Sequence, residues 1–215
     1  MMRRHEVRER ILEIGIIPVL RAASPDEAET KSHAICAGGI PLVEMTLTVP
    51  GAIDLIAALS RSMPGVLFGA GTVLDVTAAR RAIEAGAQFI VSPGLDLETV
   101  RFVKEQSVLM IGGALTPTEV ISAWKHGCDF VKIFPCANVG GPGYIKALKA
   151  ALPHVRMIPT GGVNLANIEA FFRAGAEAVG IGGELTSAAS VTEAAREFVA
   201  AVAKAKGNLQ GAKHG

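Results

Sequence analysis

A lysine inside an apolar segment is the first residue of this sequence that could do chemistry. Lys132 lies in the segment 129–135, between Val131 and Ile133 and close to two phenylalanines. An ammonium group in such surroundings is costly unless it is paired or gives up its proton, and a neutral amine is a nucleophile. Such an amine can form an imine (Schiff base) with a carbonyl substrate. The alternative is a structural lysine at a strand end whose ammonium group reaches water.

A second ionisable residue, Glu44, lies in a similar apolar run. Because side chains alternate along a strand, Glu44 shares one face with Thr46, and Lys132 shares one face with Phe134. If both faces line the interior of one barrel, Glu44 and Lys132 meet there, and their opposite charges offset much of the cost of burial. A carboxylate beside an imine-forming lysine can also move protons during carbinolamine dehydration and C–C cleavage. The alternative is a buried ion pair with a structural role.

Eight short apolar runs would position these side chains. The expected strands cover residues 16–21, 42–47, 66–70, 88–92, 108–112, 129–134, 156–160 and 178–182. Between them, apolar residues recur at helical spacing. Eight strands alternating with eight helices, after a leading helix within residues 1–15, predict a (β/α)8 TIM barrel with an additional N-terminal helix. A doubly wound sheet is the alternative, but it more often has six strands or fewer, and no GxGxxG motif follows the first strand here.

The composition is that of one large domain. Half of the 215 residues are hydrophobic but only 5% are aromatic, and 24 are glycine, which suits helices packed closely on a sheet. No linker rich in Pro, Gly or Ser divides the chain. We therefore expect a single domain over residues 1–215, with a flexible tail at about 207–215.

Charge and cysteine content argue against several classes of function. The net charge of +1 gives no basis for a nucleic-acid or acidic-membrane partner. Residues 1–15 mix basic and acidic side chains, unlike a signal peptide, and no apolar run is long enough to span a bilayer. Three cysteines without a CxxC motif predict reduced thiols and a cytoplasmic location. No histidine ends an expected strand beside a carboxylate, so we expect neither a metal site nor a cofactor.

The carboxyl ends of the expected strands hold further candidates, and in a TIM barrel these ends form the active site. The first strand ends in Arg21, whose planar guanidinium could bind a substrate carboxylate. The seventh and eighth strands end in glycine pairs, whose backbone N–H groups can approach an anion closely. These pairs are Gly161 with Gly162 and Gly182 with Gly183.

Five segments of the sequence resemble the class I 2-keto-3-deoxy-6-phosphogluconate (KDPG) aldolases, also called KDPG/4-hydroxy-2-oxoglutarate aldolases. They are EMTLTVP at 44–50, GAGTV at 69–73, GAQFIVSPG at 86–94, VKIFP at 131–135 and PTGGVN at 159–164. The resemblance runs from about residue 16 to residue 183. It implies a homotrimeric (β/α)8 barrel that needs no metal. It also implies the cleavage of KDPG, a keto acid, to pyruvate and glyceraldehyde 3-phosphate through a lysine imine, in the Entner–Doudoroff pathway.

The resemblance also implies roles for individual residues. Lys132 would be the Schiff-base lysine, and Glu44 would be the general acid/base. Thr72 would bind the pyruvate carboxylate. The remaining residues would line the pocket (Pro93, Phe134 and Thr160) or hold the phosphate (Gly161, Gly162, Gly182 and Gly183).

The sequence departs from the family pattern at three places. Thr48 stands where many members have a carboxylate-binding arginine, and we expect Arg21 to take over that role. The fifth strand ends in Gly112 and Gly113 instead of Pro-Gly, which predicts a looser loop at the pocket mouth. Glu184 follows the last glycine pair, where a serine that helps to bind phosphate is often found. A carboxylate there should weaken phosphate binding, unless it points away.

Several alternatives remain open from the sequence. An aldolase of this kind could act on 4-hydroxy-2-oxoglutarate, on 2-keto-3-deoxy-6-phosphogalactonate or on an unphosphorylated 2-keto-3-deoxy acid. A different class of function would be a phosphosugar-binding barrel without turnover, or an isomerase or epimerase on the same scaffold. Binding alone does not require a buried amine beside a carboxylate, so the Lys132 and Glu44 pair favours the aldolase.

Overall fold

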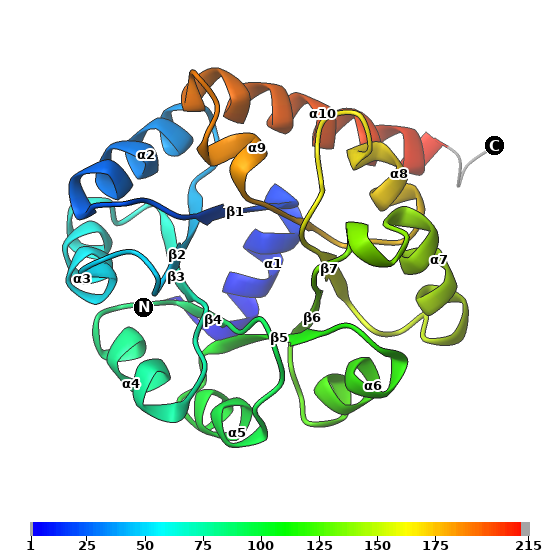
Figure 1. Cartoon of the computed structure of the whole chain (residues 1–215), viewed down its shortest axis with the longest axis horizontal. Helices are drawn as coiled ribbons and strands as arrows, with labels where there is room; N and C mark the ends of the chain where they lie inside the picture. The colour runs from blue at the N-terminus through cyan, green and yellow to red at the C-terminus, as the bar shows by residue number, and fades with distance from the viewer. Residues whose placement is uncertain (1, 212–215) are drawn as a thin grey trace.

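Eight parallel strands form the centre of the molecule, and helices surround them (Figure 1). The computed structural model describes residues 2–211. The strands are β1 (Ile16–Leu20), β2 (Leu42–Thr46), β3 (Leu67–Gly71), β4 (Phe89–Val91), β5 (Leu109–Ala114), β6 (Phe130–Ile133), β7 (Met157–Pro159) and β8 (Val179–Ile181). They are hydrogen-bonded in the order β7-β6-β5-β4-β3-β2-β1-β8, and a bridge between Thr160 and Gly180 links the two outer strands. The predicted (β/α)8 barrel is confirmed.

The helices follow the strands as the apolar spacing predicts. They are α1 (Arg4–Ile14), α2 (Pro25–Ala37), α3 (Ala52–Ser62), α4 (Val76–Glu84), α5 (Leu97–Glu105), α6 (Pro117–Lys125), α7 (Pro142–Ala151), α8 (Ile168–Arg173), α9 (Gly183–Thr186) and α10 (Val191–Gly211), with a 3₁₀ turn at Ala137–Val139. Capping residues set several of these starts: the hydroxyl of Ser24 accepts the N–H of Glu27, and that of Thr116 accepts the N–H of Glu119. Within residues 2–211, no helix has both the length and the apolar character that a bilayer span requires.

The leading helix α1 lies across the end of the barrel where the strands begin, which we call the amino end (Figure 1). Its Val7 and Ile11 are fully buried. Arg4 pairs with Asp129, the residue before β6, at 2.9 Å to each carboxylate oxygen. The opposite end, where the strands finish, is the carboxyl end and carries the residues predicted to act on substrate.

The glycines of the fifth strand do not form a loop. β5 continues to Ala114, so Gly112 and Gly113 lie inside the strand, and the N–H of Gly113 donates to the carbonyl of Gly94 at 3.1 Å. A Cβ atom on Gly113 would lie 2.2 Å from the backbone carbonyl carbon of Pro93. The prediction of a looser loop is therefore wrong: glycine is needed here because the segment after β4 packs directly against the strand.

The flexible tail predicted at about 207–215 begins within α10: residues 207–211 are helical, and residues 212–215 lie outside the described residues. The apolar side of α10 continues through Val202 and Ala205 to Leu209, which packs against the core. Gly207 faces open space, so its lack of a side chain removes nothing from that packing. Helical spacing of the buried positions thus prevails over the local composition.

Candidate active site

Lys132 and Glu44 meet inside the barrel. Lys132 comes from β6 and Glu44 from β2, which are separated by three strands in the sheet order, so the two side chains reach each other across the interior. The Nζ atom of Lys132 lies 3.3 Å from Oε1 of Glu44. Lys132 is only 6% exposed and Glu44 only 2%. The alternation of side chains along the two strands predicted this meeting, and the structure confirms it.

The amine of Lys132 is held by few contacts. An ammonium group can donate three hydrogen bonds. Among the residues that the structure describes, Lys132 donates one, to Glu44, and its Nζ atom lies 5.7 Å from the centre of the Phe134 ring. A buried amine with spare bonding capacity can approach the carbonyl carbon of a substrate.

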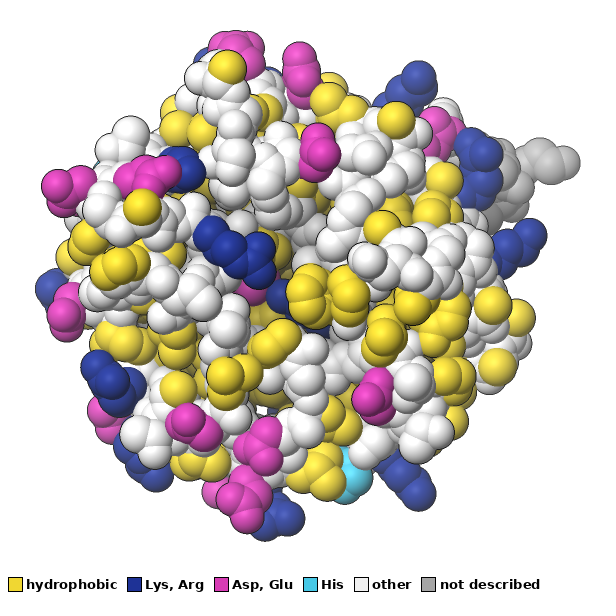
Figure 2. All heavy atoms as spheres, viewed as in Figure 1, with side chains coloured by type: hydrophobic (Ala, Val, Ile, Leu, Met, Phe, Trp, Pro, Cys, Tyr) yellow, Lys and Arg dark blue, Asp and Glu magenta, His cyan; other side chains and the backbone are white. Residues whose placement is uncertain are grey.

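A cavity of about 350 Å³ opens at the carboxyl end of the barrel. Seven of the predicted site residues line it: Arg21, Phe134, Thr160, Gly161, Gly162, Gly182 and Gly183. Lys132 stands two residues before Phe134 on the same strand face, deeper in the barrel. Figure 2 shows basic side chains gathered around the hollow at the centre of the molecule. The structure thus brings together side chains from the first, sixth, seventh and eighth strand ends.

Arg21 is a free cation at the rim of this cavity. It is exposed and takes part in no ion pair within residues 2–211. One of its terminal nitrogen atoms lies 3.8 Å from where a Cβ atom of Gly182 would be, so the guanidinium sits beside the eighth strand end. Its planar fork is available to a carboxylate.

Thr72 and Pro93 follow β3 and β4 at the same end of the barrel, but they are not among the residues that line the cavity. Thr72 has a φ of 58°, which is unusual for a β-branched residue. Its hydroxyl makes no hydrogen bond within the described part of the chain. Strained residues of this kind cluster at functional sites.

The glycine pairs of the seventh and eighth strands have different backbone conformations. Gly161 and Gly162 have φ values of 91° and 78°, which strain residues other than glycine. Gly183 begins the short helix α9, so its N–H has no partner within the helix. Glu184 follows it, is exposed and lines the same cavity. Glu184, which the sequence places near the predicted phosphate-binding glycines, is therefore part of the cavity wall.

Comparison with known proteins identifies the family. The model of the KDPG and KHG aldolase family matches residues 7–202. The chain belongs to this family. The 2-dehydro-3-deoxy-phosphogluconate aldolase of Pseudomonas aeruginosa is 36% identical to it over 73% of this chain and 71% of the relative. The 2-dehydro-3-deoxy-6-phosphogalactonate aldolase of Escherichia coli is 34% identical over 89% of this chain and 94% of the relative.

A solved structure of the same family shows how close the folds are. The KDPG aldolase of Legionella pneumophila superposes with a TM-score of 0.81 at 29% identity, covering 90% of this chain and 96% of that protein. That structure holds pyruvate captured at low pH as a covalent carbinolamine intermediate. The KDPG and KHG aldolase fold is therefore common to both chains.

Two features of this family member were not assigned from the sequence. The hydroxyl of Thr46 donates to the carbonyl of Leu20 at 2.9 Å and lies 2.8 Å from that of Thr48. The pair ties β2 to the end of β1, directly before Arg21. The second feature is Gly71, which adjoins the carboxylate of Glu44. Side-chain alternation placed Thr46 on the face of Glu44 but did not indicate its bond to Leu20, and the contact at Gly71 depends on how the side chains pack in space.

The cysteines of this aldolase are poor nucleophiles. Burial raises the pKa of Cys128 to about 12 and the pKa values of Cys36 and Cys136 to about 11. All three thiols are therefore protonated at neutral pH. Within residues 2–211 there is also no cluster of three His, Cys, Asp or Glu side chains that could hold a metal ion.

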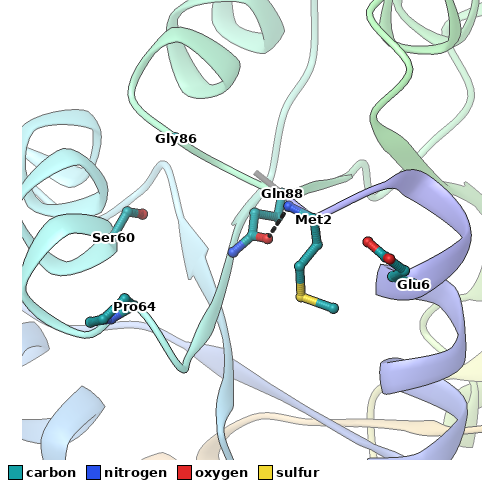
Figure 3. Close-up of a pocket in the computed structure, with 6 residues that line it drawn as sticks. All are labelled: Met2, Glu6, Ser60, Pro64, Gly86 and Gln88. Carbon is teal, nitrogen blue, oxygen red and sulfur yellow. Dashed lines mark hydrogen bonds between the residues drawn. The ribbon is translucent and has the colours of Figure 1, made fainter.

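A larger cavity of about 650 Å³ lacks the chemistry of the carboxyl end (Figure 3). It lies beside α1 and is lined by Met2, Glu6, Ser60, Pro64, Gly86 and Gln88. Its one ionisable lining residue, Glu6, is bound to Arg3, which holds the pKa of the carboxyl below its ordinary value. The candidate site is therefore chosen by the buried pair of Lys132 and Glu44 and not by cavity size.

Proposed function

We propose that this family member is a class I aldolase that cleaves KDPG to pyruvate and glyceraldehyde 3-phosphate through an imine on Lys132. The observation that carries the proposal is the buried Lys132 amine 3.3 Å from the Glu44 carboxylate. A protein that only binds a phosphosugar has no need for this pair, whose burial is costly. The family membership of the chain supports the same reaction.

The proposed reaction uses the amine and the carboxylate in sequence. The Nζ atom of Lys132 attacks C2 of the keto acid, and loss of water from the carbinolamine leaves an imine. The bond between C3 and C4 then breaks: its electrons flow into the imine and form an enamine, while the C4 hydroxyl loses its proton and becomes the aldehyde. The enamine takes up a proton at C3, and water releases pyruvate. Glu44 is the group beside Lys132 that can carry these protons.

The remaining site residues are assigned to substrate binding. Arg21 and Thr72 would hold the C1 carboxylate, because among residues 2–211 the guanidinium has no ion-pair partner and the hydroxyl makes no hydrogen bond. Pro93, Phe134 and Thr160 would line the pocket around the reacting carbons. The phosphate would lie against the glycine pairs, where backbone N–H groups can approach it (Gly161, Gly162, Gly182 and Gly183).

The galactonate epimer of KDPG is the second candidate substrate. The aldolase of 2-dehydro-3-deoxy-6-phosphogalactonate aligns with 89% of this chain, against 73% for the Pseudomonas aeruginosa relative. The two substrates differ in configuration at C4, the carbon that becomes the aldehyde. Measuring kcat/KM for both epimers separates them. Measuring kcat/KM also for 4-hydroxy-2-oxoglutarate and for the unphosphorylated keto-deoxy acid shows how much the phosphate raises kcat/KM. A small increase would indicate that Glu184 at the cavity wall weakens phosphate binding.

The decisive experiment is reductive trapping. The protein is incubated with pyruvate and borohydride, and the adduct is located by intact mass and peptide mapping. We expect one pyruvyl group, on Lys132, and none on Lys149 or Lys206, which are bound to carbonyl groups and, for Lys149, a carboxylate. A folded protein that forms no adduct would contradict the aldolase and leave the binding protein as the better reading.

We further propose that the protein works as a cytoplasmic homotrimer in the Entner–Doudoroff pathway, without a cofactor and without a nucleic-acid or membrane partner. The family resemblance supports the trimer and the pathway, and the near-neutral net charge supports the absence of a polyanionic partner. Native mass spectrometry measures the oligomer directly. A monomer at micromolar concentration would contradict that part of the proposal while leaving the imine chemistry untouched.

A further inference from the structure

We infer that Gly71 is a positioning residue that keeps open the space for the Glu44 carboxylate, an inference that rests on the proposed acid/base role of Glu44. Gly71 is the last residue of β3, is buried, and pairs in register with Thr46 of β2. Its neighbours thus place it directly beside the inward-facing side chains of the catalytic strand.

The space at Gly71 is already filled by the carboxylate. A Cβ atom added there would lie 2.2 Å from Oε1 of Glu44, 2.7 Å from its Cγ atom and 2.8 Å from its Cδ atom. Contacts shorter than 3.0 Å are essentially never made by real Cβ atoms. Any side chain at Gly71 therefore requires Glu44 to move.

The backbone does not require glycine at this position. Gly71 is not among the residues with a positive φ, whereas the next residue, Thr72, has a φ of 58°. An alanine could adopt the conformation of Gly71 without strain. Glycine stands here because of Glu44 and not because of a turn.

Displacement of Glu44 changes the distance between the carboxylate and the reacting atoms. The Nζ atom of Lys132 also lies 3.3 Å from Oε1, and Glu44 is only 2% exposed, so the carboxylate has little free space near its present place. Misplacing a catalytic group by about 1 Å can cost about 10²-fold in rate. The amine itself is on a different strand and keeps its own backbone position.

Two other glycines provide matched controls. A Cβ atom on Gly180 would lie 2.2 Å from Oγ1 of Thr160, so alanine there crowds a different residue of the pocket. A Cβ atom on Gly65, just before β3, would meet nothing within 4 Å. Gly65→Ala thus adds the same methyl group without a clash, and we expect it to leave activity unchanged.

The test is a double-mutant cycle between Gly71→Ala and Glu44→Ala. In the wild-type background, we expect Gly71→Ala to lower kcat by about 10- to 100-fold, with KM changed by less than about threefold, while pyruvate is still trapped on Lys132. In the Glu44→Ala background, where the carboxylate is absent, Gly71→Ala should lower the remaining rate by less than about twofold. For variants too slow for the cleavage assay, the rate at which the methyl protons of pyruvate exchange with D₂O is compared instead. Gly180→Ala should show no such dependence on Glu44.

Equal losses from Gly71→Ala in both backgrounds would overturn the inference, and so would full activity of the single variant. If Gly71→Ala alone does not fold, thermal unfolding replaces the kinetics: Glu44→Ala should restore folding, and failure to do so would overturn the inference as well. A wild-type protein that traps no pyruvate would instead remove the proposed function itself, so the two failures are distinct.

Discussion

Lysines at the two ends of the barrel differ in how many hydrogen bonds they make. At the amino end, Lys149 donates to Glu177 at 2.6 Å and to the carbonyl of Val155 at 2.7 Å. Lys206 donates to the carbonyls of Leu12 and Glu13 at 2.7 and 3.0 Å, although its burial lowers the pKa of its ammonium group. Each of these amines has two close partners. They are occupied in holding elements together.

At the carboxyl end, by contrast, Lys132 has one partner at 3.3 Å within the described residues. Lys206 is also partly buried, but both of its close contacts are backbone carbonyl groups that it already binds. What distinguishes Lys132 is bonding capacity that the protein leaves unused. A substrate carbonyl can therefore compete for this amine but not for the other two.

The most severe way to break this comparison is to remove Lys132. We expect Lys132→Ala to abolish cleavage and reductive trapping, because no other described lysine has a free amine in the barrel interior. Steady-state kinetics and mass spectrometry on the folded variant measure both. Substantial turnover by Lys132→Ala would show that the imine mechanism is wrong.

Replacing Glu44 keeps the proposed nucleophile, Lys132, and removes the proposed proton carrier. Glu44→Gln should lower kcat by about 10²- to 10⁴-fold, the usual contribution of general acid–base catalysis, while pyruvate is still trapped on Lys132. The amide has nearly the shape of the carboxylate, so the packing beside Gly71 is kept. Kinetics within tenfold of the wild type would instead assign Glu44 a structural role.

The equivalent change at the amino end should affect stability and not chemistry. Lys149→Met removes both hydrogen bonds of a lysine whose side chain is 13% exposed, and it leaves the Glu177 carboxylate with the backbone N–H of Met157 but without its cation. We expect a loss of about 2 kcal/mol in the free energy of unfolding, seen as a lower urea midpoint. The kcat of the folded enzyme should not change. A large fall in kcat, measured at equal folded fraction, would contradict the assignment of Lys149 to stability alone.

The smallest expected effect concerns Glu119, a carboxylate at the carboxyl end of the barrel that is already hydrogen-bonded within the protein. Backbone N–H groups of Thr116 and Leu115 hold the pKa of Glu119 below its ordinary value of 4.5. The ionised form therefore stabilises the fold above the unfolded-state pKa, and this stabilisation is lost as the pH falls through the lower folded-state value.

The variant for this test is Glu119→Gln, which cannot ionise. Its Tm at pH 7 should lie about 1–3 °C below that of the wild type, and the gap should narrow toward pH 3. Activity should stay the same, because Glu119 belongs to a helix start and not to the cavity. A gap independent of pH would mean that the charge of Glu119 contributes nothing.

The sequence predicted the features of the molecule that follow from local pattern. Alternation within β2 and β6 put Glu44 and Lys132 each on a face with other predicted site residues, and it predicted that the two would meet if both faces lined the barrel interior, as they do. Arg21 and the glycine pairs were found because a barrel directs its strand ends to one place.

The missed features depend on contacts between segments far apart or on backbone torsion. Gly113 was interpreted as a loop residue because glycine is common in loops, whereas packing against Pro93 is what requires it. The left-handed φ of Thr72 contradicts the preference of its own residue type, so no local rule predicts it. A tail was predicted from about Gly207 because the local composition does not show that Val202 and Leu209, on the same helix, pack against distant parts of the core.

The ion pair between Arg4 and Asp129 has a consequence for the order in which the chain folds during its synthesis. The two residues are 125 positions apart, and Lys206 binds the carbonyl of Leu12 across 194 positions. At roughly 5–20 residues per second, Arg4 is synthesised about 6–25 s before Asp129, its partner just before β6. During that interval, the apolar side chains of Val7 and Ile11 have no complete barrel to pack against. The amino end of the barrel is therefore the last part to pack, after the strands that α1 covers have been made.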